Sequence, residues 1–295
     1  MNPKLSAAIA TTLWGFTYIV STTMLPHNPL LIAAVRALGG AIVLLLLTRQ
    51  FPVAAWWGKL IVLGTLNAGL FFALLFIAAL RLPGGVAAIF QAFSPLCVIL
   101  LGWAILGARP TLLKTAAVLI GVAGVSLVVL KGDTSIDLIG VTAALGSALS
   151  FALGGVLINK WGRPPMSMLS FTGWQLLIAG VELSLVALLA NDIPERITAI
   201  NIVGFLLLAL LLTDLAFVLW FKAIASAGAV VVAPFILLTP ITAFVLDALI
   251  KGFIPTIFQI MGAIIVFAGL FLSQWTPRAR AIAVAADSGR APHEK

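Results

Sequence analysis

The sequence has very little charge for its length. Of its 295 residues only 9% are Asp, Glu, Lys or Arg, whereas 62% are hydrophobic, and the mean hydropathy is +1.22. Soluble domains carry about 25% charged residues, so this chain cannot cover a soluble globule with polar surface. The apolar runs are continuous and far longer than the roughly 10-residue alternating strands of a membrane barrel. The sequence therefore predicts an all-α membrane protein.

Residues suited to catalysis or metal binding are also scarce. Cys97 is the only cysteine, which excludes an intrachain disulfide. The two histidines, His27 and His293, are too far apart in the sequence to suggest a metal site. The chain contains no P-loop, HExxH or GxSxG motif. We therefore expect no catalytic residue, no metal and no cofactor, and the singly scattered basic residues give no reason to expect a nucleic-acid partner.

Apolar segments long enough to cross a bilayer follow one another along most of the chain. A spanning helix needs about 20 apolar residues. The first segment resembles a signal peptide in length, but it contains Trp14, Gly15 and Tyr18 and lacks a small-x-small cleavage site, so we expect an uncleaved helix. Ten spans are predicted, at about 4–24, 30–48, 58–80, 84–106, 111–130, 136–158, 167–190, 200–222, 228–250 and 255–275. The polar residues 276–295 are expected to form a disordered tail.

The distribution of Lys and Arg predicts the orientation of these spans. With the N-terminus inside, twelve basic residues fall on the cytoplasmic side, and only Arg81, Lys131, Arg196 and Lys251 fall outside. Both termini are therefore expected in the cytoplasm of a bacterial-type inner (plasma) membrane, and the bilayer is an expected partner.

The two halves of the sequence are alike at a constant offset of 145 residues. "FIAALRLPGGVAAIFQAFSP" (76–95) aligns with "FKAIASAGAVVVAPFILLTP" (221–240), and the register continues without a gap to Gly124 over Gly269. The match predicts a duplication, with repeats at 1–132 and 133–275. Because each repeat has five helices, an odd number, the two must be inverted relative to one another, as in many secondary transporters.

The fourth and ninth segments of this duplication contain residues that weaken helices. Proline removes a backbone hydrogen bond and bends a helix, and such defects survive at membrane depth only beside protein or a watery cavity. We therefore expect kinks at Pro95, Pro234 and Pro240, with Gly84 and Gly85 as a close-packing or hinge point. The bent pair should flank a central cavity.

These features together resemble one known superfamily. The "LWGFTYIV" opening, the "[ST]P" pairs at 94–95 and 239–240, and the following "GARPT" and "GFIPT" turns are similar to those of the drug/metabolite transporter superfamily. Within it the chain most resembles the EamA-type exporters, including the YddG branch. The resemblance covers roughly residues 4–275 and implies ten helices and the export of amino acids or other metabolites.

Four ionisable residues lie within the predicted spans. A charge in hydrocarbon is costly, so each is a functional candidate. Asp247 precedes Lys251 by four residues near the end of its segment, which favours a local ion pair or snorkelling toward water over a role in transport. Arg36 and Glu182 lie at similar depth, and both a structural pair and a substrate role fit them. Asp214, near the middle of its segment, could bind an ammonium group, take up a coupling proton or only bond neighbouring hydroxyls.

Aromatic rings and neutral polar groups complete the predicted site. Trp14 and Trp220 lie too deep for the aromatic belt at the membrane surface. Rings combined with uncharged hydrogen-bonding groups suit amphipathic organic solutes such as amino acids. The predicted substrate-binding residues are Trp14, Phe76, Phe90, Gln91, Ser94, Trp174, Gln175, Asp214, Trp220, Phe235 and Thr239.

The favoured function is that of a secondary transporter. It would export small metabolites, foremost amino acids including aromatic ones, by alternating access through a cavity between the repeats. A transporter of drugs or of sugar- or nucleotide-derived metabolites is the alternative within the same fold. A membrane-embedded enzyme is the alternative of another class, although no His, Asp or Cys cluster at catalytic spacing supports it. The chain is expected to act on a small-molecule substrate as a monomer or weak homodimer.

Overall fold

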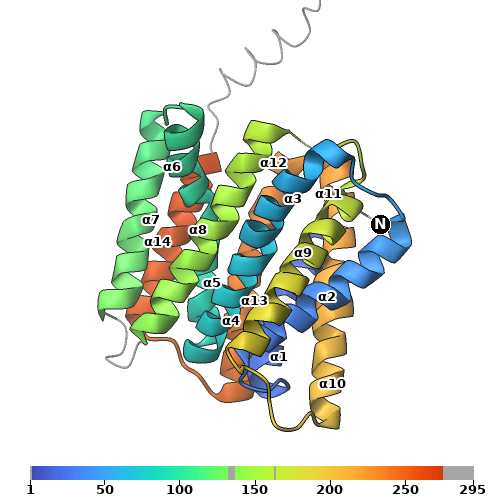
Figure 1. The fold of residues 1–295 in the computed structure, drawn as a ribbon. Helices are drawn as coiled ribbons and strands as arrows, with labels where there is room; N and C mark the ends of the chain where they lie inside the picture. Colours follow the sequence, from blue (N-terminus) through green and yellow to red (C-terminus); the bar gives the residue numbers. More distant parts are fainter. Residues whose placement is uncertain (1, 132–136, 163, 275–295) are drawn as a thin grey trace, which may run out of the picture.

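A computed structural model describes residues 2–131, 137–162 and 164–274, and all regular secondary structure in the described chain is helical (Figure 1). Eight described helical segments are long and apolar enough to cross a membrane, and two shorter apolar helices, Leu112–Val128 and Ile257–Ser273, accompany them. The protein is thus a multi-pass, all-α membrane protein. The predicted tail, 276–295, lies outside the described residues.

The helices of the first half follow the predicted spans closely. They are α1 (Pro3–Thr23), α2 (Pro29–Thr48), η1 (Ala54–Trp56), α3 (Trp57–Gly64), η2 (Thr65–Leu70), α4 (Phe71–Arg81), α5 (Gly84–Ala92), α6 (Ser94–Leu106) and α7 (Leu112–Lys131). The third segment changes to a π-helix at η2, and the fourth is interrupted between Ala92 and Ser94, directly before Pro95.

The second half repeats this order. Its helices are α8 (Leu138–Trp161), α9 (Met168–Leu189), α10 (Ala199–Leu206), η3 (Leu207–Leu215), α11 (Ala216–Ala227), α12 (Ala229–Val232), η4 (Ala233–Leu237), α13 (Leu238–Lys251) and α14 (Ile257–Gln274). Here η3 is again a π-helix, and η4 is a short 3-10 stretch that contains Pro234.

The offset seen in the sequence is also present in the backbone. The first residue of α5 maps onto the first residue of α12, the end of α6 onto the end of α13, and the start of α7 onto the start of α14. Gly107 and Gly252, which follow α6 and α13, adopt positive φ angles of 68° and 65°. A residue with a Cβ would be strained in this left-handed conformation. Glycine thus ends the equivalent helix in both halves.

Helices of the two halves pack against one another throughout the bundle. The helix α2 packs on α9, α7 packs on α14, and α5 packs on α13, while α1 lies against α11 and α13 as α8 lies against α4 and α6. Small residues permit the close approach: a Cβ added to Gly124 would lie 2.8 Å from the carbonyl oxygen of Gly262. Such small-residue contacts are the usual way in which helices associate in lipid.

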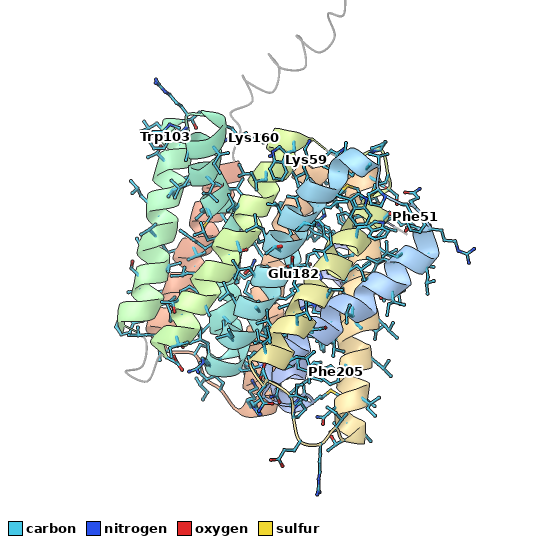
Figure 2. All side chains as sticks on the ribbon, viewed as in Figure 1. Phe51, Lys59, Trp103, Lys160, Glu182 and Phe205 are labelled. Carbon is cyan, nitrogen blue, oxygen red and sulfur yellow. The ribbon has the colours of Figure 1, made fainter. Side chains whose placement is uncertain are left out.

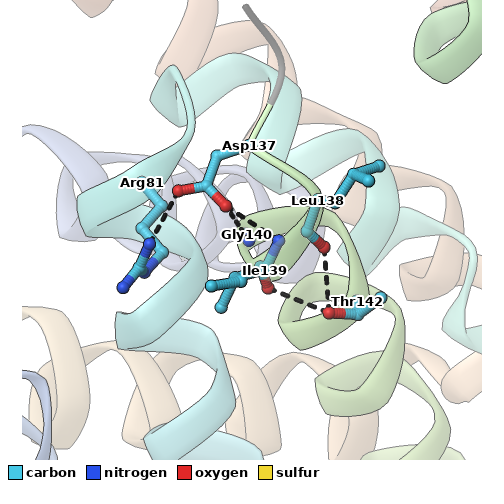
Figure 3. Close-up of polar contacts among 6 residues, drawn as sticks. All are labelled: Arg81, Asp137, Leu138, Ile139, Gly140 and Thr142. Atoms are coloured by element: carbon cyan, nitrogen blue, oxygen red, sulfur yellow. Dashed lines mark hydrogen bonds and ion pairs between the residues drawn. The ribbon is translucent and has the colours of Figure 1, made fainter.

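Polar side chains fix the ends of several helices. Asp137 caps α8 by accepting hydrogen bonds from the backbone N–H groups of Ile139 and Gly140, at 2.8 and 3.1 Å (Figure 3). Its other oxygen lies 2.7 Å from Nη1 of Arg81, so the cap also ties the end of α4 to the start of α8. The hydrogen bond from Arg81, followed by those from the backbone, lowers the pKa of Asp137.

Candidate functional site

A cavity of about 160 Å³ lies in the interior between the two halves. Helices α1, α2, α4, α5 and α6 contribute from the first half, and α8, α11, η4 and α13 contribute from the second. Its walls are formed by Trp14, Thr17, Tyr18, Arg36, Phe71, Phe72, Leu75, Ala88, Gln91, Ala92, Ser94, Pro95, Phe151, Phe217, Ile236, Thr239 and Pro240. A second, more open hollow of about 420 Å³ borders the end of α4 and of α13, with Arg81 and Lys251 in its wall.

Aromatic rings form much of the cavity wall. The Trp14 ring meets the Phe217 ring edge-on, with 5.6 Å between centroids, and it also contacts Trp220 at 5.3 Å. On another side, Phe71 lies 5.1 Å from Phe151 of α8. Because these contacts join α1 to α11 and α4 to α8, the rings connect the two halves and give the cavity an apolar surface.

Uncharged polar groups interrupt this apolar wall. The Ser147 hydroxyl lies 3.0 Å from Oε1 of Gln91 and 2.8 Å from the carbonyl oxygen of Ala144, and its single proton is shared between these two acceptors. The Thr17 hydroxyl is buried and has no hydrogen-bond partner among the described residues. The amide of Gln91 and the hydroxyl of Thr17 can therefore bind a solute in the cavity.

The hydroxyl groups that precede the two prolines bind backbone across the halves. Ser94 donates to the carbonyl oxygen of Ala148 in α8 at 3.2 Å, and Thr239 donates to that of Thr11 in α1 at 2.9 Å. Each side chain borders the cavity, but its hydroxyl proton is already used. Both residues thus hold the kinked helices in place.

Arg36 brings a positive charge to the cavity wall. Its side chain is buried, with only 4% exposed. Nε donates to the Thr213 hydroxyl at 2.9 Å, and the guanidinium carbon lies 4.5 Å above the centre of the Phe72 ring. A cation–π contact of this kind stabilises a desolvated cation by about 2 kcal/mol. An Arg at the centre of a membrane helix costs at least about 2.5–3.5 kcal/mol, so this contact does not fully offset the burial.

None of the three intramembrane acids lines the cavity, and two of them bind other residues. Glu182, midway along the bundle in Figure 2, accepts a hydrogen bond from the Thr65 hydroxyl at 2.7 Å. It forms no ion pair with Arg36, which settles one alternative left open by the sequence. Asp247 pairs with Lys251 at 3.2 Å, which confirms the local ion pair, and also accepts the Gly85 N–H at 3.0 Å.

Asp214 lies in the π-helix η3 and packs against α2. Its oxygen Oδ1 is 3.3 Å from the position that a Cβ on Gly40 would take. Both carboxylate oxygens are buried and have no hydrogen-bond partner in the described part of the chain. Asp214 directly follows Thr213, whose hydroxyl accepts a hydrogen bond from the cavity-lining Arg36. Asp214 itself does not line the cavity.

The structure brings four of the eleven predicted substrate-binding residues to the cavity: Trp14, Gln91, Ser94 and Thr239. Of the predicted kink residues, Pro95 and Pro240 also line it, whereas Pro234 lies in η4. Gly84 and Gly85 serve as a close-packing point, because a Cβ on Gly84 would lie 2.7 Å from that of Tyr18 and one on Gly85 would overlap the Phe244 ring.

Several other predicted residues lie elsewhere. The Trp174 indole N–H donates to the carbonyl oxygen of Gln50 at 2.8 Å, and Gln175 bonds Asn67 at 2.8 Å. Phe90 and Phe76 are fully buried, Phe76 with its ring 5.7 Å from the Arg36 guanidinium carbon. Phe235 packs with Trp220 in a cluster beside Ala7, Ala223 and Val232.

The spacing of residues in α1 also indicates which of its side chains face the cavity. Trp14, Thr17 and Tyr18 are spaced i, i+3 and i+4, so they share one face of α1. All three line the cavity. Arg36 and Phe72, from α2 and α4, carried no such local pattern, because only the packing of separate helices brings them to the cavity.

Comparison with known proteins identifies the class to which this fold and cavity belong. The EamA-like transporter family matches twice, at residues 3–130 and 138–275, so the chain belongs to that family of membrane transporters and contains two copies of its repeat.

Individual relatives agree with this assignment. The chain is 38% identical to protein PecM of Dickeya dadantii, over 93% of both chains. It is 26% identical to a probable amino-acid metabolite efflux pump of Salmonella typhimurium, over 93% of this chain and 95% of that one. A solved crystal structure has the same fold, with a TM-score of 0.63 at 20% identity over 92% of this chain and 96% of the other.

Proposed function

We propose that the protein exports small metabolites and that amino acids, including aromatic ones, are its favoured substrates. The observation that carries this proposal is the cavity between the halves, in which aromatic rings surround the neutral groups of Gln91 and Thr17. Its volume of about 160 Å³ is below the roughly 300–1,000 Å³ of sites for drug-sized ligands. This favours a solute of amino-acid size over a drug. The name of the Salmonella relative supports the same substrate class.

Alternating access is the proposed mechanism. In this proposal ten helices form two inverted five-helix repeats, divided near residues 132 and 133. The interruption before Pro95 and its counterpart η4 border the cavity, where irregular backbone is tolerated at membrane depth. Rocking of one repeat against the other would open the cavity to one side of the membrane and then to the other.

The proposed orientation places both termini in the cytoplasm of a bacterial-type inner membrane. Lys59 and Lys160 lie at the same end of the bundle, opposite Phe205 (Figure 2). That end would be cytoplasmic by the positive-inside rule. The measurement is a pair of fusions at the C-terminus, one to a reporter active only in the cytoplasm and one to a reporter active only in the periplasm. Activity of the periplasmic fusion alone would overturn this orientation.

Transport can be tested with purified protein in proteoliposomes. We expect radiolabelled amino acids to exchange across the membrane and to be recovered chemically unchanged. A panel that also contains a sugar, a nucleoside and a cationic dye would distinguish the alternative substrates of the same fold. Conversion of a solute would instead indicate a membrane-embedded enzyme, and movement of none of them would reject the proposal.

The position of the substrate can be tested by cysteine labelling. In a Cys97→Ala background, Gln91→Cys should react with a membrane-impermeant thiol reagent, and an exported amino acid should block the reaction. Trp174→Cys is the matched control, because Trp174 lies in the second turn of α9 and outside the cavity. We expect its labelling to be independent of the solute. Equal labelling of Gln91→Cys with and without solute would place the substrate elsewhere.

A further inference from the structure

The guanidinium group of Arg36 has hydrogen-bonding capacity left over. Nε donates to Thr213 at 2.9 Å, and Nη2 makes a long contact of 3.4 Å with the carbonyl oxygen of Leu212. Nη1 has no hydrogen bond or ion pair with the described residues. Since the side chain lines the cavity, this free donor is available to a solute.

No described carboxylate neutralises this cation. Glu182 is bonded to Thr65, and Asp247 is paired with Lys251. The oxygens of Asp214 lie more than 4.0 Å from the Arg36 nitrogen atoms, since the two residues form no ion pair in the part of the chain described. The cavity wall therefore holds one unneutralised positive charge, and its lining residues include no Asp or Glu.

We propose that Arg36 binds the carboxylate group of the transported solute. A guanidinium group presents two parallel N–H donors that match the two oxygens of a carboxylate. The Thr17 hydroxyl, buried and without a partner among described residues, is a second polar group on the same cavity wall. The rings of Trp14, Phe71 and Phe217 would then receive the apolar remainder of the solute.

This inference rests on the proposed function and narrows its substrate class. A single cation matches one carboxylate, which favours a monocarboxylate or an amino acid over a phosphate or a dicarboxylate. It also gives Arg36 a role within the cavity. The bound carboxylate would become the partner of the guanidinium group and would offset part of the free energy that its burial costs. A solute that lacks the acid group should leave that charge unpaired.

The test uses the full-length protein in nanodiscs and two probes of nearly the same shape. The probes are 3-phenylpropionate and its neutral amide, and the readouts are Kd and the shift in Tm on binding. We expect the acid to bind at least tenfold more tightly than the amide. Arg36→Gln should raise the Kd of the acid at least tenfold and leave the Kd of the amide unchanged. Arg49→Gln is the matched control, since Arg49 is exposed at the other end of α2, and both affinities should remain as in the wild type.

The outcomes separate this inference from the proposed function, because binding does not require transport. Equal affinity for acid and amide in the wild type would overturn the role of Arg36, even if amino acids move across proteoliposomes. Preference for the acid that depends on Arg36, without transport of any solute, would support the site and reject the exporter. If Arg36→Gln does not fold, Arg36→Lys replaces it. Lysine cannot make the paired contact, so the Kd of the acid should rise at least threefold, and an unchanged Kd would overturn the proposal.

Discussion

The hydroxyl group of Thr239, directly before Pro240, donates to the carbonyl oxygen of Thr11 at 2.9 Å and ties α13 to α1. Ser94, directly before Pro95, makes the equivalent contact between α6 and α8 with Ala148. The two donors, Ser94 and Thr239, correspond at the offset of 145 residues. Each repeat thus fixes its kinked helix to the first helix of the other.

We expect Thr239→Val to destabilise the protein by about 0.5–1.5 kcal/mol, because the variant loses the hydrogen bond that joins α13 to the Thr11 carbonyl oxygen of α1. Ser94→Ala should have a similar effect, because it removes the equivalent hydrogen bond to Ala148. Thermal unfolding in detergent measures the change. Thr142→Val is the control, since its hydroxyl bonds only within its own exposed helical turn, and a loss as large as that of Thr239→Val would contradict this account.

Gly124→Ala should destabilise the contact between α7 and α14. The new Cβ would lie 2.8 Å from both the Gly262 carbonyl oxygen and the Val266 backbone nitrogen, and overpacking of this kind costs about 1–3 kcal/mol. Gly102→Ala is the matched control, because a Cβ there has no neighbour within 4 Å and alanine favours a helix over glycine. The Tm of Gly124→Ala should fall and that of Gly102→Ala should not. Equal Tm changes would show that backbone entropy, not packing, controls both sites.

Asp137 should make the stability of the fold depend on pH in the acidic range. Its pKa is lowered in the folded protein by Arg81 and by the cap of α8. The stabilisation is therefore complete above the ordinary pKa of 3.8 and is lost as the pH falls through the lower folded value. Asp137→Asn should remove this contribution in a Tm-against-pH series that runs from about pH 6 down to about pH 2, through the range below the ordinary pKa of 3.8. Arg81→Gln should reduce it but retain the helix cap, and an unchanged series for Asp137→Asn would contradict the assignment.

Asp214 is the proposed coupling group if transport uses a proton gradient. Its oxygens have no partner among the described residues, and Arg36 donates a hydrogen bond to the preceding residue, Thr213. Asp214→Asn should flatten the dependence of proteoliposome transport on pH, while the protein still folds in the membrane. Glu182→Gln is the control, since that carboxylate already accepts a bond from Thr65. If Asp214→Asn keeps the pH profile of the wild type, Asp214 has a structural role only.

The sequence by itself determined the membrane class, the bounds of the helices and the duplication. These properties follow from local composition, because hydrophobic length, helix-ending glycines and repeated prolines act within a single segment. The same local reasoning found Trp14, Gln91, Ser94 and Thr239, which lie on or beside the irregular helices. It did not find the π-helices η2 and η3, since the apolar sequence of these segments continues that of the α-helices on either side.

Only the tertiary structure decided which polar groups meet. Arg36, Thr213 and Phe72 come from three helices that are distant in the sequence, and the contact of α2 with α4 and η3 brings them together. The packing of α9 on η2 directs Glu182 to Thr65 rather than to Arg36. An isolated helix does not fix these partners, because residues on different helices are related only by crossing angle and depth. The charge of the cavity is therefore a property of the assembled bundle.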